Sequence, residues 1–435
     1  MRAGRARFPP LLRDPRPPRQ GDGLTEIDAR TRRNAAVTLL IARAVYAFSW
    51  YNVGAVLPLI GTGLGVDAAQ LGIVLGSFLL GAAVFQLPAG FAALRWGNRR
   101  VSVVALAVMG TFALASAASP DWYVLAALRF GAGAGAALFF APALGLVASY
   151  YPAGTRGPII GLYNAAFSIG AAVGLFAGAV IGLAFGWPWA LAIGGIGLLL
   201  VALGAAATLP DRTPPVVRRT FGELRAAAAP VLRSRPIWAL GIAVTGLWAG
   251  FYIVAQYFVE FASSAHPGWS LALAASLPTV TILMEVVGGP VGGWFGERLR
   301  DMRRAVLLFG VPSAVAILLV PFLPLAGLIV LFVFLGFAAG VVFAVLYLIP
   351  SYLPEVGGEN LSLALALING IQIFAGSGIA IAFGFIAVSA GYTDAWLFAG
   401  AVSLVTLPLL LGVSGSRSGA TPVGAHEGRR PERPT

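Results

Sequence analysis

The sequence is 435 residues long, 58% of them hydrophobic and only 11% charged, and its mean hydropathy is +0.86. Because soluble domains carry about 25% charged residues, this composition excludes a water-soluble globular protein. Apolar stretches of about 20 residues, long enough to cross a hydrocarbon core of about 30 Å, recur along the whole chain. We therefore expect an all-α polytopic membrane protein embedded in a lipid bilayer.

The formal net charge is +12, and all 29 basic residues are arginines. Many lie in polar tails, which we expect to meet anionic lipid headgroups rather than nucleic acid. There are no cysteines, and His266 and His426 fall in a predicted loop and a tail, which excludes a thiol site or a histidine relay within the membrane. We expect no metal, no cofactor and no enzymatic activity, since neither HExxH nor GxSxG occurs.

Twelve apolar segments are predicted to span the membrane. They cover residues 36–60, 69–93, 101–119, 122–148, 157–183, 186–208, 237–261, 270–295, 303–323, 325–349, 360–388 and 393–414. The predicted divisions are a disordered basic tail (1–35), a six-helix half (36–208), a cytoplasmic linker (209–236), a second six-helix half (237–414) and a disordered tail (415–435). Arginines flank the spans on one side, which is the positive-inside pattern. We expect both termini in the cytoplasm and the chain in the cell (inner) membrane.

The chain also repeats itself. The segment QLPAGFAALRWGNRRV around Arg95 resembles GGPVGGWFGERLRDMRRA around Arg298, 203 residues further on. A second match, SYYPAG with SYLPEV, places Pro152 and Pro354 202 residues apart. Two independent matches at nearly one offset predict two six-span halves in parallel register.

The loop after the second span, GFAALRWGNRR, contains Gly90, Arg95, Gly97 and Arg99 and resembles the loop 2–3 signature of the major facilitator superfamily of secondary transporters. The segment RFGAGAGAA, which begins at Arg129, resembles that family's signature in the fourth span. The resemblance covers nearly everything except the tails. It implies twelve helices in two pseudo-symmetric halves that give alternating access to a central site.

The loop signature departs from the family at one position. Leu94 stands where the family carries an acid, whereas the second copy keeps Glu297. In the family that acid helps to close the cytoplasmic side, so the resemblance implies a latch that depends on the second half or is weaker. The residues assigned to gating are Gly90, Arg95, Gly97, Arg99, Glu297 and Arg298.

The fifth span reads SIGAAVG and lacks the proline of the family's exporter-type signature, which disfavours a drug exporter. Its glycines, Gly170, Gly174 and Gly178, recur every four residues. Small residues at this spacing let two helices approach closely, so we expect a packing role for them.

Arg43 stands in the apolar run LLIARAVYAFSWYNVGAVL, roughly 12 Å into the first span at 1.5 Å per residue. One interpretation is that it snorkels to the headgroups. Tyr46 and Trp50, however, follow at i+3 and i+7 and share its face. A guanidinium beside two aromatic side chains can hold a carboxylate by bidentate pairing. We interpret Arg43 as the counter-charge of the substrate.

Glu285, in TVTILMEVVGGP, is twelve residues before Glu297, or roughly 18 Å along the helix and close to mid-membrane. A carboxyl group there can couple proton binding to transport, or it can be a structural acid paired with an arginine or a backbone amide. Arg129 is assigned to proton coupling by the family resemblance, and helix packing is the alternative for it.

Several further polar side chains are predicted to shape the substrate site. Trp248, Tyr252 and Gln256 recur every four residues along the seventh span and share one face. Glu260 continues this spacing at the outer end of the span, where it can simply be solvated, and is not assigned to the site. The others are Tyr163 and Asn164 in the fifth span, Tyr347 in the tenth, and Asn369 and Gln372 in the eleventh. Asparagine and glutamine also join helices, so a structural role stays open for them.

These residues predict a monomeric alternating-access transporter of a small organic or inorganic anion. Transport would be linked to protons or to a counter-substrate. Two alternatives remain open: an exporter of cationic or amphipathic compounds, and a transporter-like sensor that moves nothing. Substrate identity and direction do not follow from the sequence.

Overall fold

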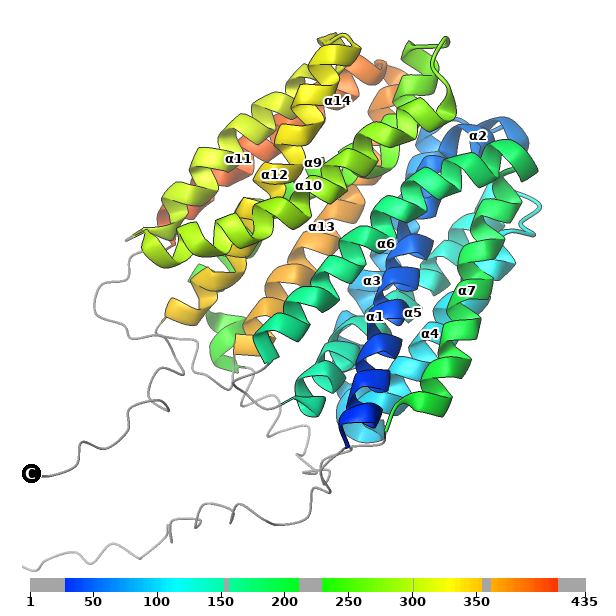
Figure 1. Cartoon of the computed structure of the whole chain (residues 1–435). Coiled ribbons are helices and arrows are strands. Elements are labelled where there is room, and N and C mark those ends of the chain that lie inside the picture. Colours follow the sequence, from blue (N-terminus) through cyan, green and yellow to red (C-terminus); the bar gives the residue numbers. More distant parts are fainter. Residues whose placement is uncertain (1–27, 152–155, 211–228, 300, 354–360, 414–435) are drawn as a thin grey trace, which may run out of the picture.

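The computed structural model describes residues 28–151, 156–210, 229–299, 301–353 and 361–413 (Figure 1). Within these ranges, twelve helices are long and apolar enough to cross a membrane, which confirms the predicted all-α fold. They are α1 (Ala29–Ala55), α3 (Ala68–Trp96), α4 (Asn98–Ser116), α5 (Trp122–Tyr150), α6 (Arg156–Phe185), α7 (Trp187–Thr208), α9 (Arg235–Ala265), α10 (Leu271–Arg298), α11 (Met302–Leu319), α12 (Leu325–Leu348), α13 (Leu361–Ser389) and α14 (Tyr392–Thr406). Short 3₁₀ segments, Val320–Phe322, Ile349–Tyr352 and Leu407–Gly412, extend α11, α12 and α14.

The first span differs from the prediction at both ends. Helix α1 begins at Ala29, within the tail predicted to be disordered, because Asp28 caps it by accepting hydrogen bonds of 2.9 Å from the backbone N–H groups of Arg30 and Thr31. The helix then breaks at Val56, and a separate helix, α2 (Leu57–Leu64), follows with a proline in its first turn. Proline lacks the N–H that would continue α1, which explains the break.

The two halves, α1–α7 and α9–α14, lie side by side (Figure 1). Helix pairs that join them are α1 and α2 with α9, α3 with α13, and α6 with α10. We call the end where α1 begins the terminal end, and the opposite end, where α2 lies, the loop end.

The halves pack closely at the loop end. A Cβ atom added to Gly72 of α3 would lie 3.3 Å from the Cα of Gly384 of α13, and one added to Gly76 would collide with Ile381. On the same two helices, a Cβ atom added to Gly90 or Gly370 would meet nothing within 4 Å. These helices therefore pack against each other near the loop end and not at these glycines toward the terminal end.

The glycines of the fifth span have the predicted packing role. Cβ atoms added to Gly170, Gly174 and Gly178 of α6 would each collide with the backbone of α1 or come within van der Waals contact of it. The two helices are neighbours within the amino-terminal half. Close approach is thus the reason for glycine here.

The structure also shows the predicted repeat. Arg95 and Arg298 lie in the last turns of α3 and α10. Gly133 packs against the carbonyl oxygen of Phe78, and Gly336, 203 residues further on, packs against that of Thr281, which is 203 residues after Phe78. The second pair from the sequence, Pro152 and Pro354, lies outside the described residues.

Candidate functional site

Arg43 is buried inside the amino-terminal half. Its side chain is 5% exposed, so it does not reach the headgroups. Its guanidinium carbon lies 4.4 Å from the ring centroid of Phe167, 5.0 Å from those of Tyr46 and Phe140, and 5.1 Å from that of Tyr163. These rings come from α1, α5 and α6. Each lies within the distance, about 6 Å, at which an aromatic face attracts a cation.

The Arg43 guanidinium has unused hydrogen-bonding capacity. Its Nε and Nη1 atoms are buried without a hydrogen-bond partner, and no carboxylate pairs with it in the described part of the chain. Burying a charge without a partner is costly, and the surrounding rings offset only part of that cost. The arrangement therefore suits an anion that brings its own acceptors.

Tyr46 and Trp50 continue from Arg43 along α1, as the spacing predicted. Their ring centroids are 5.7 Å apart. The Tyr46 hydroxyl approaches the Ala136 carbonyl oxygen at 3.5 Å, and the Trp50 indole N–H is buried without a hydrogen bond. Trp50 also lies edge-on to Phe78 of α3, with centroids 4.7 Å apart.

The α9 side chains diverge along the helix. Trp248 and Tyr252 stack with their centroids 5.6 Å apart, and Trp248 packs on Gly376 of α13. Tyr252 lies beside Trp50 of the other half, and the next turn, at Gln256, packs directly on Gly54 of α1. Gln256 is fully buried, and neither atom of its amide has a partner.

Glu260, at the loop end of α9, turns away from the other half. Its Oε1 lies 3.5 Å from the Tyr392 hydroxyl of α14, and its Oε2 is buried without a partner. The predicted stripe thus divides into residues that face α1 and residues that face the carboxyl-terminal half.

Glu285 of α10 is half-buried, and no hydrogen bond or ion pair reaches it from the described residues. Its carboxyl group is in electrostatic range of the hydroxyls of Tyr51 of α1 and Tyr347 of α12. Thr281, one turn away, donates instead to the Phe332 carbonyl at 3.0 Å and joins α10 to α12. Within the described residues, neither an arginine nor a backbone amide pairs with Glu285.

Tyr51 was missed by the sequence reasoning. Its hydroxyl is in electrostatic range of both Arg43 and Glu285, the two predicted key residues. Phe140 and Phe167 of the Arg43 site were also missed. Phe167 had a usable signal, because it follows Tyr163 by four residues and shares its helix face.

The remaining predicted site residues differ in how deeply they are buried. Tyr163 is fully buried with its hydroxyl unpaired, whereas Asn164 is exposed. Gln372 is fully buried with both amide atoms unpaired, and Asn369, on the same helix, is half-buried. Tyr347 is 36% exposed.

The loop signature forms a turn between α3 and α4. Gly97 ends α3 with φ of 82°, a left-handed conformation that favours glycine. Arg99 then donates from Nε to the Leu209 carbonyl at 2.6 Å and from Nη2 to the Ala206 carbonyl at 2.5 Å. It therefore joins α4 to the terminal end of α7 within the amino-terminal half.

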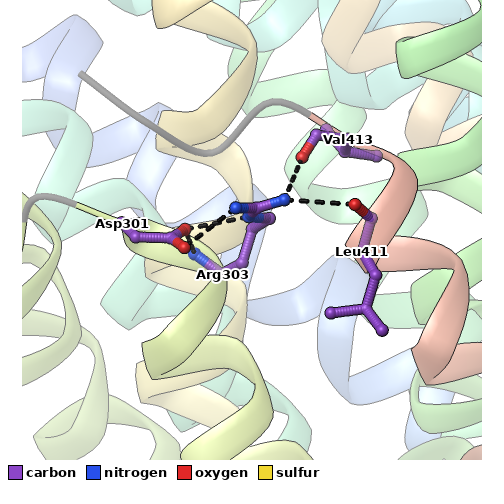
Figure 2. A network of polar contacts seen from close by, with 4 residues as sticks. All are labelled: Asp301, Arg303, Leu411 and Val413. Atoms are coloured by element: carbon purple, nitrogen blue, oxygen red, sulfur yellow. Dashed lines mark hydrogen bonds and ion pairs between the residues drawn. The ribbon is translucent and has the colours of Figure 1, made fainter. Parts of the chain in front are cut away.

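The second half has an equivalent clamp with an added acid (Figure 2). Arg303, the second residue of α11, donates to the carbonyls of Leu411 at 3.2 Å and Val413 at 2.7 Å. It also makes a bidentate ion pair with Asp301, with both N···O distances 2.9 Å. The hydrogen bonds from Arg303 lower the pKa of Asp301.

The other gating candidates are not brought into contact across the halves. Arg95 stacks on Trp96 at 5.8 Å, and Arg298 stacks on Trp294 at 4.1 Å. All four side chains are exposed. The side chain of Glu297 lies outside the described part of the structure.

Comparison with known proteins identifies the class. A sequence model of the Major Facilitator Superfamily matches residues 39–369. The chain therefore belongs to the Major Facilitator Superfamily. Twelve spans, two repeated halves and this membership define a membrane transporter rather than an enzyme.

Relatives and solved structures agree with this class. Over 181 residues the chain is 32% identical to the 4-hydroxybenzoate transporter PcaK of Pseudomonas aeruginosa, a match that covers 41% of this chain and only 40% of that protein. It is 29% identical over 252 residues to the puromycin resistance protein pur8 of Streptomyces alboniger, covering 58% and 45%. The xylose transporter XylE from E. coli, in an inward open conformation, superposes with a TM-score of 0.72 at 13% identity over 90% of this chain and 98% of that chain, which shows the shared fold.

Proposed function

We propose that this protein carries a small organic anion across the membrane by alternating access, with Arg43 as its counter-charge. One observation carries the proposal: the Arg43 guanidinium is buried among four aromatic rings, and two of its nitrogen atoms lack partners. A carboxylate would accept hydrogen bonds from the guanidinium, and an apolar or aromatic body would pack against the rings.

The relatives support an organic acid as cargo. The matching transporters of three bacteria are named for 4-hydroxybenzoate, an aromatic carboxylate. The similarity covers about two fifths of the chain, so it supports the class of substrate and not its identity.

We assign coupling to Glu285. When ionised, the Glu285 carboxylate would repel an anionic substrate in the central site, and Tyr51 is in electrostatic range of both Glu285 and Arg43. Protonation of Glu285 would then favour anion binding, and anion release would favour loss of the proton, because linkage between two ligands is reciprocal. Proton symport follows from this arrangement, while exchange against a second anion would need Arg43 alone.

An exporter of cationic compounds is the second candidate. Glu285 has no partner among the described residues and would attract a cation, and relatives of this chain include puromycin and quinolone resistance proteins. In that case Arg43 would serve only to hold α1, α5 and α6 together.

Counterflow in proteoliposomes tests the proposal. Vesicles that contain the purified full chain are loaded with unlabelled 4-hydroxybenzoate or with puromycin, and uptake of the labelled form is followed. We expect transient accumulation of labelled 4-hydroxybenzoate and none of puromycin. Accumulation of puromycin alone would establish the exporter, and protein-free vesicles give the background.

A further inference from the structure

Arg129 is a second buried arginine, close to the loop end. It lies seven residues after the start of α5, or roughly 10 Å along the helix, and is 1% exposed. Its guanidinium carbon lies 4.5 Å from the ring centroid of Phe78, and its Nε is buried without a hydrogen bond. Like Arg43, it has no ion pair in the described part of the chain.

The arginines that join helices in this protein form hydrogen bonds to backbone carbonyls. Arg99 and Arg303 each donate to two backbone carbonyls at the end of a neighbouring span. Arg129 is more deeply buried, and no hydrogen bond from its guanidinium to a carbonyl is seen among the described residues. Helix packing therefore does not account for its charge.

The two buried arginines lie at opposite ends of one run of aromatic rings. From Arg129 the run passes through Phe78 to Trp50, whose centroids are 4.7 Å apart, and then to Tyr46, 5.7 Å from Trp50. Tyr46 in turn lies 5.0 Å from the Arg43 guanidinium. The run extends from near the loop end toward mid-membrane.

Unpaired polar groups gather around the Arg129 end of this run. The Arg129 charge is in electrostatic range of the Tyr252 hydroxyl of α9. Gln256, on the next turn of α9, packs on Gly54 of α1 with its amide unpaired, and the Trp50 indole N–H is also unpaired. Each such group costs free energy when it is buried without a partner. These unpaired groups therefore destabilise the contact between the halves.

We propose that Arg129, Trp50, Tyr252 and Gln256 form a second binding site for the carboxylate cargo, used when the halves separate at the loop end. The guanidinium, the indole N–H and the amide N–H of Gln256 donate to the carboxylate, while the Tyr252 hydroxyl donates or accepts. The anion then passes along the aromatic run to Arg43. This proposal rests on the proposed anion function and adds an entry site to it.

Transport measured separately from each face tests the site. Right-side-out and inside-out membrane vesicles from one expression host give the KM for labelled 4-hydroxybenzoate at each face. The chain has no cysteines, so a single Gly268→Cys label with a membrane-impermeant maleimide identifies the loop face. Gly268 is exposed, and an added Cβ would meet nothing within 4 Å.

We expect Arg129→Gln to raise the KM at the loop face at least about tenfold, as for loss of a charge-assisted hydrogen bond, and to change the KM at the terminal face less than about twofold. Arg43→Gln should raise the KM at both faces. Arg235→Gln, at an exposed arginine, is the control and should change neither.

Gln256→Met tests the same site independently, in case Arg129→Gln does not fold. Gln256→Met removes two unpaired buried polar atoms and keeps the side-chain shape, so it should fold normally and still raise the loop-face KM. Unchanged loop-face values in both variants, or equal increases at both faces, would overturn the second site while leaving the anion function intact. Absence of 4-hydroxybenzoate transport by the wild type from both faces would overturn the anion function itself.

Discussion

The two halves of the protein share a fold and differ in their buried charges. In the amino-terminal half, Arg43 and Arg129 are buried among aromatic rings without carboxylate partners. In the carboxyl-terminal half, the interior of the described spans holds two acids, Glu260 and Glu285. The two halves therefore share their helix packing and differ in the charged side chains buried between the helices.

The buried charged residues can be compared with the residues at the matching positions of the other half. The residue 202 positions after Arg43 is Thr245, which satisfies its own hydroxyl by donating to the Gly241 carbonyl at 2.8 Å. The residue 203 positions after Arg129 is Phe332, and the one 203 positions before Glu285 is Ala82. None of the three charges has a counterpart. Symmetry therefore accounts for the helix contacts, and the asymmetric residues are the candidates for cargo and coupling.

The largest expected effect is at Arg43. We expect Arg43→Ala to abolish counterflow of 4-hydroxybenzoate and Arg43→Lys to reduce its rate roughly 10- to 100-fold, because a point charge does not reproduce the planar fork that grips a carboxylate. Thr245→Val, at the equivalent position of the other half, should reduce the rate less than about twofold. Initial rates at matched protein levels measure this.

One result for the Arg43 and Thr245 variants would contradict the assignment of Arg43. If Arg43→Lys transports at the wild-type rate while Thr245→Val does not, the asymmetry between the halves would have been assigned to the wrong side. Thermal melting of each variant shows whether a loss of rate reflects a loss of folded protein.

The next effect concerns coupling. Glu285→Gln imitates the protonated acid, so it should still exchange substrate within about twofold of the wild-type rate and should lose accumulation driven by a pH gradient. Glu260→Gln, at the acid that faces Tyr392, should keep gradient-driven accumulation. Counterflow and gradient-driven uptake in the same proteoliposomes separate the two. Full gradient-driven uptake by the Glu285 variant would place coupling elsewhere.

The fold could be predicted from the sequence because it depends on local and repeated signals. Hydropathy marks the spans, and the match between the segments around Arg95 and Arg298 indicates the repeat. The break at Val56 was missed, since an apolar run hides it and Pro58 alone did not decide between a kink and a new helix. Asp28 extended α1 into a segment whose composition is typical of a disordered tail.

The site was only partly predictable, since periodicity gives the face of a helix and not what that face meets. Arg43, Tyr46 and Trp50 were found because they share a face of one helix. Tyr51 is in electrostatic range of both Arg43 and Glu285, a relation that depends on the tertiary structure and not on the spacing within one helix. Arg99 was assigned to gating by resemblance, whereas its carbonyl partners in α7 follow only from tertiary structure.

A smaller effect distinguishes the two arginine clamps. Arg303→Gln should lower the Tm in detergent by about 2–5 °C, through loss of an ion pair and two hydrogen bonds, and Arg99→Gln should lower it less. The reason is that Arg303→Gln leaves Asp301 without its partner, while no acid pairs with Arg99 in the described residues. Differential scanning fluorimetry measures this. Equal shifts would show that the acid adds nothing to the clamp.

The smallest effect isolates that acid. Asp301→Asn keeps a good helix cap, since asparagine caps about as well as aspartate, and removes the charge together with one of the two oxygens that accept from Arg303. Hydrogen bonds from Arg303 lower the pKa of Asp301, so its ionised form stabilises the folded state above the ordinary carboxyl range, and that stabilisation is lost as the pH falls through the lowered pKa. A partly exposed pair contributes about 0.2–1 kcal/mol, so we expect the variant to melt roughly 1–2 °C below wild type at pH 7. The gap should close at pH values well below the lowered pKa, where both proteins lack the negative charge. A gap that persists unchanged in acid would assign the effect to the cap, and the charge difference between the clamps would then have no role in stability.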